Sequence, residues 1–201
     1  SIPLVTLGTF LLWFGWFGFN GFSQLAMGTF DDVNAISKIA VNTHLAGAAG
    51  TVTGAALTRL IGGKTDIVMM LNGALAGLVA ITAEPLTPGP ITAMIIGSIG
   101  AVIMYYGTKL LENFGLDDVV GAIPVHMFAG IFGTLVVPLT NADTSFGTQF
   151  TGVISVCVFS FVLSWITFST LKSTVGLRIS RAAEKQGTDK AEVGVIAYSI
   201  R

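Results

Sequence analysis

The feature that most constrains this chain is the spacing of its charged residues. Each gap between charged clusters is about 17–30 residues long, and an α-helix needs ~20 apolar residues to cross a hydrocarbon core ~30 Å thick. Six such gaps occur, at residues 1–30, 39–58, 67–83, 85–108, 119–142 and 144–171. They predict an all-α polytopic membrane protein with six transmembrane helices. We expect the spans at about 4–27, 36–59, 66–83, 91–111, 118–139 and 148–172.

Composition supports the same class and excludes others. Hydrophobic residues make up 52% of the chain and charged residues 10%, whereas a soluble domain carries about 25% charged residues. Ten basic residues balance eleven acidic ones, so the lipid bilayer is the expected partner and nucleic acid is not. The single cysteine, Cys157, lies in an apolar run, and we expect no metal site and no cofactor. The sequence contains no GxSxG or HExxH motif, so we do not expect an enzyme.

The basic residues predict the orientation of the chain. With alternating spans, nine of them fall on one side: Arg59, Lys64, Lys109, Lys172, Arg178, Arg181, Lys185, Lys190 and Arg201. Only Lys38 falls on the other side. The positive-inside rule therefore predicts a cell-membrane protein with both termini in the cytoplasm. Because the sequence becomes polar after Gly176, we expect a transmembrane domain over residues 1–176 and a cytoplasmic tail over 177–201.

Small residues predict that the helices pack on one another. They recur at a spacing of four within the spans: Gly50 with Gly54, Gly73 with Gly77, and Ala129 with Gly133. Helices in lipid gain little hydrophobic drive to associate, and small residues at this spacing let their backbones approach closely. We therefore expect a bundle rather than isolated membrane anchors.

Few polar side chains interrupt the spans: Asn20, Asn42, His44, Asn72 and His126. His126 is predicted near the middle of the fifth span. It is either a core histidine with satisfied hydrogen bonds or a pore-lining group, since a nearly neutral imidazole both donates and accepts hydrogen bonds. A proline precedes it and glycines follow it, which leaves an open slot beside the ring and favours the second interpretation. For His44 we favour a hydrogen bond to a neighbouring helix.

An aromatic cluster occupies residues 13–20 of the first span. Trp16, Phe19 and Ser23 are spaced i, i+3 and i+7, so they share one face of a helix. Aromatic faces attract cations by ~0.5–2 kcal/mol. The same spacing is typical of an aromatic packing or interfacial stripe, and the residues alone leave both interpretations open.

Several longer stretches together resemble the C-terminal half of an ammonium transporter of the Amt/Mep/Rh superfamily. The resemblance is colinear from about Leu7 to Tyr198 and includes the spacing of the tail residues after Gly187. Its main stretches are GWFGFN at 15–20, VNT at 41–43, NGALAGLVAIT at 72–82, VH and AGIFGTL within 125–135, and VGLRIS at 175–180.

The resemblance implies a fold of eleven helices, in which two inverted five-helix repeats precede a last long helix. The six spans here would be helices 6–11, and the N-terminal half of the same fold would be their partner. It also implies a homotrimer with one pore per subunit, through which ammonium is recruited and deprotonated and ammonia crosses. Ser23 would belong to the recruitment site, Phe19 to the gate, Trp16 to the pore lining, and His126 to a pair of pore histidines.

The chain departs from the family pattern in four ways. The first of the two pore histidines belongs to the family's fifth helix, which lies outside the matching half. Gly121 stands where the family has an aspartate, Met127 follows the histidine where the family has glycine, and Val193–Val195 replaces a His-Gly-Glu sequence. We therefore carry two hypotheses. The first is ammonium or ammonia transport through a channel-like pore of which this chain forms half. The second is an Amt-like ammonium sensor that signals through a cytoplasmic C-terminal extension.

Overall fold

A computed structural model describes residues 1–197, and this part of the chain is helical, with no β-strand. Tyr198 and Arg201, which belong to the tail pattern and to the basic residues discussed above, lie outside the described residues. The chain divides into two compact units, Ser1–Val153 and Ile154–Arg201. The all-α fold class is confirmed, and the predicted boundary between residues 176 and 177 stays a prediction.

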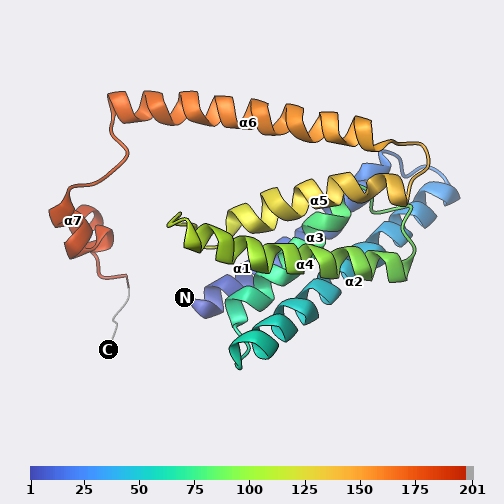
Figure 1. The fold of residues 1–201 in the computed structure, drawn as a ribbon, viewed down its shortest axis with the longest axis horizontal. Helices are drawn as coiled ribbons and strands as arrows, with labels where there is room; N and C mark the ends of the chain where they lie inside the picture. Colours follow the sequence, from blue (N-terminus) through green and yellow to red (C-terminus); the bar gives the residue numbers. More distant parts are fainter. Residues whose placement is uncertain (198–201) are drawn as a thin grey trace. The chain divides into compact units, whose positions relative to one another are not determined.

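The helices of the first unit follow the predicted spans in order (Figure 1). They are α1 (Ile2–Gly21), α2 (Phe30–Gly62), α3 (Ile67–Thr82), α4 (Pro90–Asn113) and α5 (Ala129–Val136). A 3-10 turn, Phe22–Gln24, follows α1, and a π-helical turn, Ile123–Phe128, leads into α5. A second 3-10 turn, Val137–Leu139, follows α5.

Three helical segments are long and apolar enough to cross a membrane by length and composition: Ile2–Gln24, Pro90–Asn113 and Phe146–Thr174. Two more, Ile67–Thr82 and Ile123–Leu139, are apolar but shorter. The helix α2 extends beyond its predicted span at both ends, because a capping box of Thr29 and Asp32 begins it and Gly63 ends it in the left-handed conformation. The count of six spans stays a prediction.

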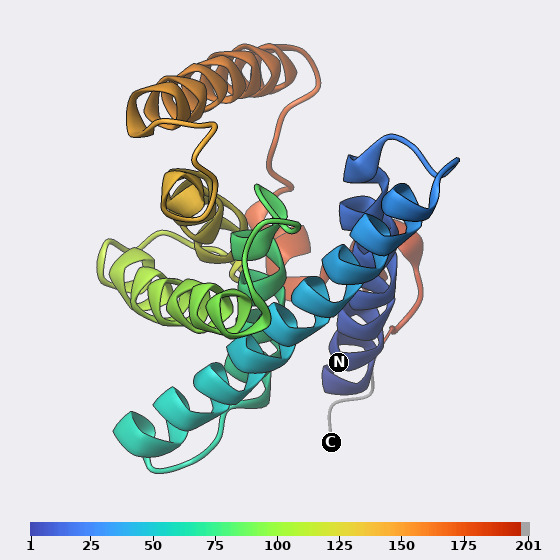
Figure 2. The same ribbon diagram turned by 90° about the vertical axis from the view of Figure 1, so that its right-hand side faces the viewer.

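The helix α3 lies at the centre of the first unit. It contacts α1, α2, α4 and α5, and most of its residues are buried. Figure 2 shows α2 as the long diagonal helix that crosses in front of α3. At this crossing a Cβ added to Gly50 would collide with the backbone oxygen of Gly73, and one added to Gly77 would collide with that of Ala46. The predicted close packing through small residues is therefore confirmed.

The fifth helix begins later than the sequence predicted. We expected an unbroken span over 118–139 with His126 near its middle, and this is wrong: residues 118–121 form a turn and the π-helical turn begins at Ile123. Gly121 has a φ of 72°, a left-handed conformation that glycine adopts without strain. Pro124 lies in the first positions of the helix, where its missing N–H costs nothing. His126 consequently lies near the start of the helix.

The second unit continues α6 (Phe146–Thr174), which begins in the first unit, and adds the tail. None of the side chains of α6 is buried. The helix ends before Gly176, which has a φ of 83°. The tail contains the short helix α7 (Arg181–Gln186), capped by the Ser180 hydroxyl, and a π-helical turn, Asp189–Val193.

Candidate pore-lining site

The rings of Trp16 and His126 are stacked. Their centroids are 6.5 Å apart and their planes differ by 11°. Trp16 lies on α1 and is half-buried, whereas His126 lies on the π-helical turn and is exposed. The structure thus brings together two of the four residues that we selected from the sequence, although more than a hundred residues separate them.

The indole of Trp16 is fixed by a hydrogen bond to α3. Its Nε1 donates to Oγ1 of Thr82 at 2.7 Å. The Thr82 hydroxyl in turn donates to the backbone oxygen of Leu78 at 2.7 Å. The Thr82 hydroxyl accepts one hydrogen bond and donates another, so its own position is fixed within α3. The plane of the Trp16 indole is therefore set by α3 as well as by α1. Thr82 lies within an apolar helix, and no local sequence signal distinguished it.

Phe19 adds a third ring next to Trp16. The two ring centroids are 6.1 Å apart with an interplanar angle of 64°, an edge-to-face arrangement. The side chain of Phe19 is 65% exposed. The order of rings is therefore Phe19, Trp16 and His126, with the anchored indole in the middle.

Ser23 lies beyond the last residue of α1. The helix ends at Gly21, and Ser23 lies in the following 3-10 turn with its side chain exposed. The expectation that Trp16, Phe19 and Ser23 share one helix face stays a prediction, because Ser23 lies in a 3-10 turn that continues the helical segment Ile2–Gln24. The chain turns here because Leu25, at the end of the 3-10 turn, adopts a left-handed φ of 58°.

His44 lies among aromatic rings of α1. Its imidazole is 5.5 Å from the Trp13 ring and 6.2 Å from the Phe17 ring, and it stacks on the latter at 18°. We expected a hydrogen bond to a neighbouring helix, and the contacts of His44 in residues 1–197 are ring contacts instead. His44 and His126 thus lie against different faces of the aromatic cluster on α1.

The buried asparagines tie neighbouring segments together. Asn20 donates from Nδ2 to Oγ1 of Thr43 at 3.0 Å, which links α1 to α2. Asn42 donates to the backbone oxygens of Pro85 and Pro88 at 2.9 and 2.8 Å, which holds the loop between α3 and α4. These bonds pair amide N–H groups that would be costly to bury alone, which indicates a structural role. The buried Oδ1 of Asn20 has no hydrogen-bond partner among the described residues.

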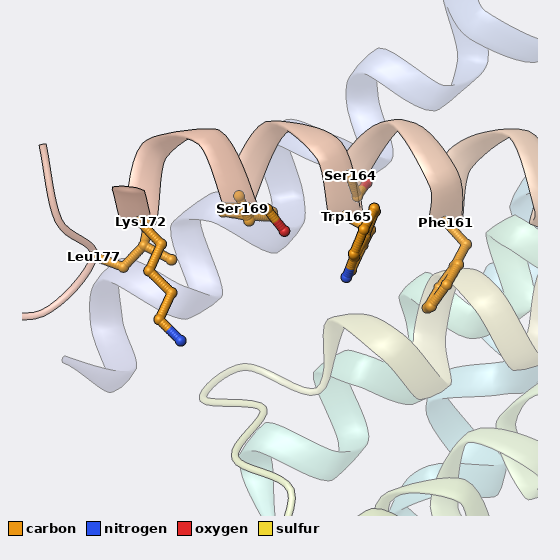
Figure 3. Close-up of a pocket in the computed structure, with 7 residues that line it drawn as sticks. Phe161, Ser164, Trp165, Ser169, Lys172 and Leu177 are labelled. Carbon is orange, nitrogen blue, oxygen red and sulfur yellow. The ribbon is translucent and has the colours of Figure 1, made fainter. Parts of the chain in front are cut away.

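The second unit has a groove of its own. It measures about 300 Å³ and is lined by Phe161, Ser164, Trp165, Phe168, Ser169, Lys172 and Leu177. Figure 3 shows Phe161, Trp165 and Lys172 projecting from the same side of α6. Apart from the Lys172 ammonium group this surface is mainly apolar, and it contains none of the selected residues. Across residues 1–197, no group of three or more His, Cys, Asp or Glu side chains is placed to hold a metal ion.

Comparison with known proteins gives consistent results over nearly the whole chain. The model of the Ammonium Transporter Family matches residues 1–198. The chain is 40% identical to ammonium transporter Amt2 of Archaeoglobus fulgidus, over 98% of this chain and 46% of that protein. It is 32% identical to an ammonium transporter of Corynebacterium glutamicum, over 100% of this chain and 46% of that protein.

Solved structures agree with the fold. A structure named Sensor Amt Protein superposes with a TM-score of 0.87 at 34% identity, covering 96% of this chain and 49% of that chain. The crystal structure of Candida albicans Mep2 gives a TM-score of 0.83 at 28% identity, with 96% and 46% covered. The chain spans about half the length of the relatives it matches. On this family match and these identities, the chain belongs to the ammonium transporter family.

Proposed function

We propose that this chain forms half of a channel-like pore that carries ammonium or ammonia across a membrane. The observation that carries the proposal is the stack of His126 on Trp16, with the exposed ring of Phe19 beside it. The relatives' names support the same substrate, because the matched curated proteins are ammonium transporters.

The chemistry of these groups suits both ammonium and ammonia. Moving a bare ammonium ion into an apolar pore is expensive. Aromatic faces such as those of Phe19 and Trp16 offset part of this cost through their ring quadrupoles. A neutral imidazole at His126 then offers ammonia a hydrogen-bond partner without binding it as tightly as a charge would. At the outer end, the Ser23 hydroxyl would accept a hydrogen bond from arriving ammonium.

The remaining part of the pore is proposed to come from an N-terminal half of the same fold. Inverted-repeat transporters place the substrate pathway between their repeats. The side chains of Phe19 and His126 are exposed in this half, so a partner on that side would cover them. We further propose a homotrimer in the cell membrane, with the C-terminus in the cytoplasm, that carries out transport and no covalent chemistry.

Uptake by the complete transporter tests this function. The transporter, with its first repeat present, is reconstituted into liposomes and offered radiolabelled methylammonium. We expect saturable uptake that ammonium inhibits and potassium does not. We expect no uptake by the 201-residue chain reconstituted alone, because only one side of the pathway is then present. Binding of ammonium without uptake by the complete protein would contradict transport.

That last outcome would favour a second candidate, an ammonium sensor. One observation supports it: the structure named Sensor Amt Protein is similar in both fold and sequence. Two departures from the family pattern point the same way, the bulk of Met127 next to His126 and the apolar tail sequence Val193–Val195. A sensor would bind ammonium, transmit a change to a cytoplasmic extension, and carry little or no flux.

A further inference from the structure

The turn that leads into the π-helical turn is held to α3 by one buried side chain, that of Asn72. We propose that Asn72 is a positioning residue for His126: it fixes where the imidazole lies without contacting ammonium or ammonia. An effect of this positioning on transport rests on the pore-lining role that is proposed above for His126. The position of the imidazole can be measured independently of transport.

Asn72 makes its hydrogen bond outside its own helix. Its side chain lies on α3 and is 7% exposed, and Nδ2 donates to the backbone oxygen of Val120 at 2.9 Å. A buried polar group that loses its partner costs ~1–3 kcal/mol. The Asn72 amide and the Val120 oxygen therefore stabilise each other, and the chain at residue 120 is held at a fixed distance from α3.

Gly121 lies directly against the same Asn72 amide. A Cβ built on this buried glycine would lie 2.7 Å from Nδ2 of Asn72, closer than side-chain carbons approach. The φ of 72° at Gly121 also favours glycine. The space that a side chain at residue 121 would need is thus taken by the Asn72 amide, so the two residues together define the path of the turn.

The turn is rigidly joined to the helix that follows. The Asp118 carboxylate accepts hydrogen bonds from the backbone N–H groups of Ala122 and Ile123, at 2.9 and 2.8 Å. These two bonds satisfy donors that the first turn of a helix leaves free. A displacement of the turn therefore moves the start of the helix with it.

His126 is linked to this turn through the backbone of the residue before it. The backbone N–H of Val125 donates to the oxygen of Gly121 at 3.2 Å, and His126 is the next residue. The ring against which His126 stacks, Trp16, is held independently by Thr82. Asn72 and Thr82 both lie on α3, ten residues or ~15 Å apart along the helix axis. One helix thus fixes both members of the stacked pair, His126 through a turn and Trp16 directly.

The test is Asn72→Leu in the complete transporter, which keeps the volume and removes the donor. We expect the maximal rate of methylammonium uptake to fall roughly ten-fold, since displacements near 1 Å of a positioned group have effects of that order or larger. The half-saturation concentration should hold, because the outer site is not touched. Asn42→Leu is the matched control: it removes another buried asparagine that donates to loop backbone oxygens, in contacts that do not involve His126.

Two further measurements separate positioning from a general loss of stability. In a His126→Ala background, Asn72→Leu should lower uptake no further, because the group it positions is gone. Nuclear magnetic resonance of labelled histidine, assigned against His126→Ala, should show the ring protons of His126 shifted as the imidazole leaves the face of Trp16. Asn42→Leu should leave these signals in place. If Asn72→Leu fails to assemble, Asn72→Gln, which keeps the amide one methylene further out, should shift the same signals by less.

Unmoved His126 signals in the Asn72 variants would overturn the proposal, and so would a loss of uptake that adds fully to that of His126→Ala. Failure of the proposed function has a different signature. In that case His126→Ala itself would leave uptake and selectivity unchanged, whereas the His126 signals would still move in the Asn72 variants.

Discussion

The imidazole of His126 lies nearly parallel to the indole of Trp16, with ring centroids 6.5 Å apart and planes within 11°. Both rings are polar at one edge and apolar on their faces, so a stack of this kind presents hydrogen-bonding atoms along the rim and an aromatic face next to them. The stack is formed by side chains from different helices, and its geometry depends on the contacts that hold each one.

Thr82→Val should loosen the stack from the Trp16 side. Valine is close to threonine in shape and lacks the oxygen that accepts from Nε1 of Trp16, so the indole loses a hydrogen bond with a net value of ~1 kcal/mol. We expect a several-fold lower maximal uptake rate with little change in folding. Uptake kinetics of the complete transporter provide the measurement.

Thr82→Ser and Thr134→Val are the controls for this prediction. Serine keeps the hydroxyl and should restore the rate. Thr134 donates to the backbone oxygen of Gly130 within α5, so Thr134→Val removes a hydroxyl of the same kind without affecting an indole. An equal loss of uptake in Thr82→Val and Thr134→Val would show that the Trp16 contact has no special role.

Phe19→Ala and Ser23→Ala should affect different properties. The exposed Phe19 ring would close the pathway to hydrated ions, so its removal should let potassium through and raise the ion leak measured as current. Ser23→Ala removes an oxygen acceptor at the outer end and should raise the half-saturation concentration of ammonium a few-fold. Unchanged leak and unchanged half-saturation in both variants would place the recruitment site and gate elsewhere.

Gly50→Ala should destabilise the bundle at the crossing of α2 and α3. Its Cβ would meet the backbone oxygen and carbonyl carbon of Gly73, which cannot move aside as a flexible side chain can. Overpacking of this kind costs ~1–3 kcal/mol, and the expected result is a lower melting temperature in detergent. Gly62→Ala is the control, because a Cβ there meets nothing within 4 Å and alanine favours helix. Equal melting temperatures for both variants would contradict the packing described for Gly50.

Features of the fold could be predicted where they depend on residues close together in the sequence. The helices were predicted because gaps between charges are a property of the sequence itself, and close packing through small residues was predicted because their spacing is local. The sequence did not show which glycines would meet, such as Gly50 and Gly73. The late start of the fifth helix was missed. It depends on the φ of Gly121 and on the Asp118 carboxylate, and an uncharged run from residue 119 gave no sign of either.

Contacts between distant segments could not be predicted from the sequence at all. The bond from Trp16 to Thr82 joins helices whose relative rotation is set by the whole bundle, and Thr82 is one of many hydroxyl residues in the chain. The family resemblance assigned Trp16 and His126 to one pore, but it did not predict that their rings stack. For Ser23, the i+7 spacing assumed an unbroken α-helix, whereas α1 ends at Gly21 and a 3-10 turn continues to Gln24.

Low pH should loosen the start of α2. Hydrogen bonds from the Thr29 hydroxyl, and then from Gln24 and the Thr29 backbone, lower the pKa of the Asp32 carboxyl below its ordinary value. A lowered pKa in the folded state means that the stabilisation is present above the ordinary pKa and is lost as the pH falls through the lowered one. Amide protection factors in the first turn of α2, taken relative to the intrinsic exchange rate at each pH, should therefore fall under acid. Asp32→Asn should exchange faster at neutral pH and show a smaller acid effect; a steep acid effect in this variant would assign the dependence to another group.

His126→Ala and His44→Ala should have opposite consequences for transport. Without its imidazole, residue 126 offers ammonia no hydrogen-bond partner beside Trp16, so we expect a changed uptake rate or a changed preference for ammonium over potassium, with assembly of the proposed trimer retained. His44 packs on Trp13 and Phe17 instead, and His44→Ala should leave uptake nearly intact while lowering the melting temperature. Both variants are measured side by side for uptake, selectivity and melting. If His44→Ala alters transport and His126→Ala alters only stability, the pore runs along the other face of the aromatic cluster on α1.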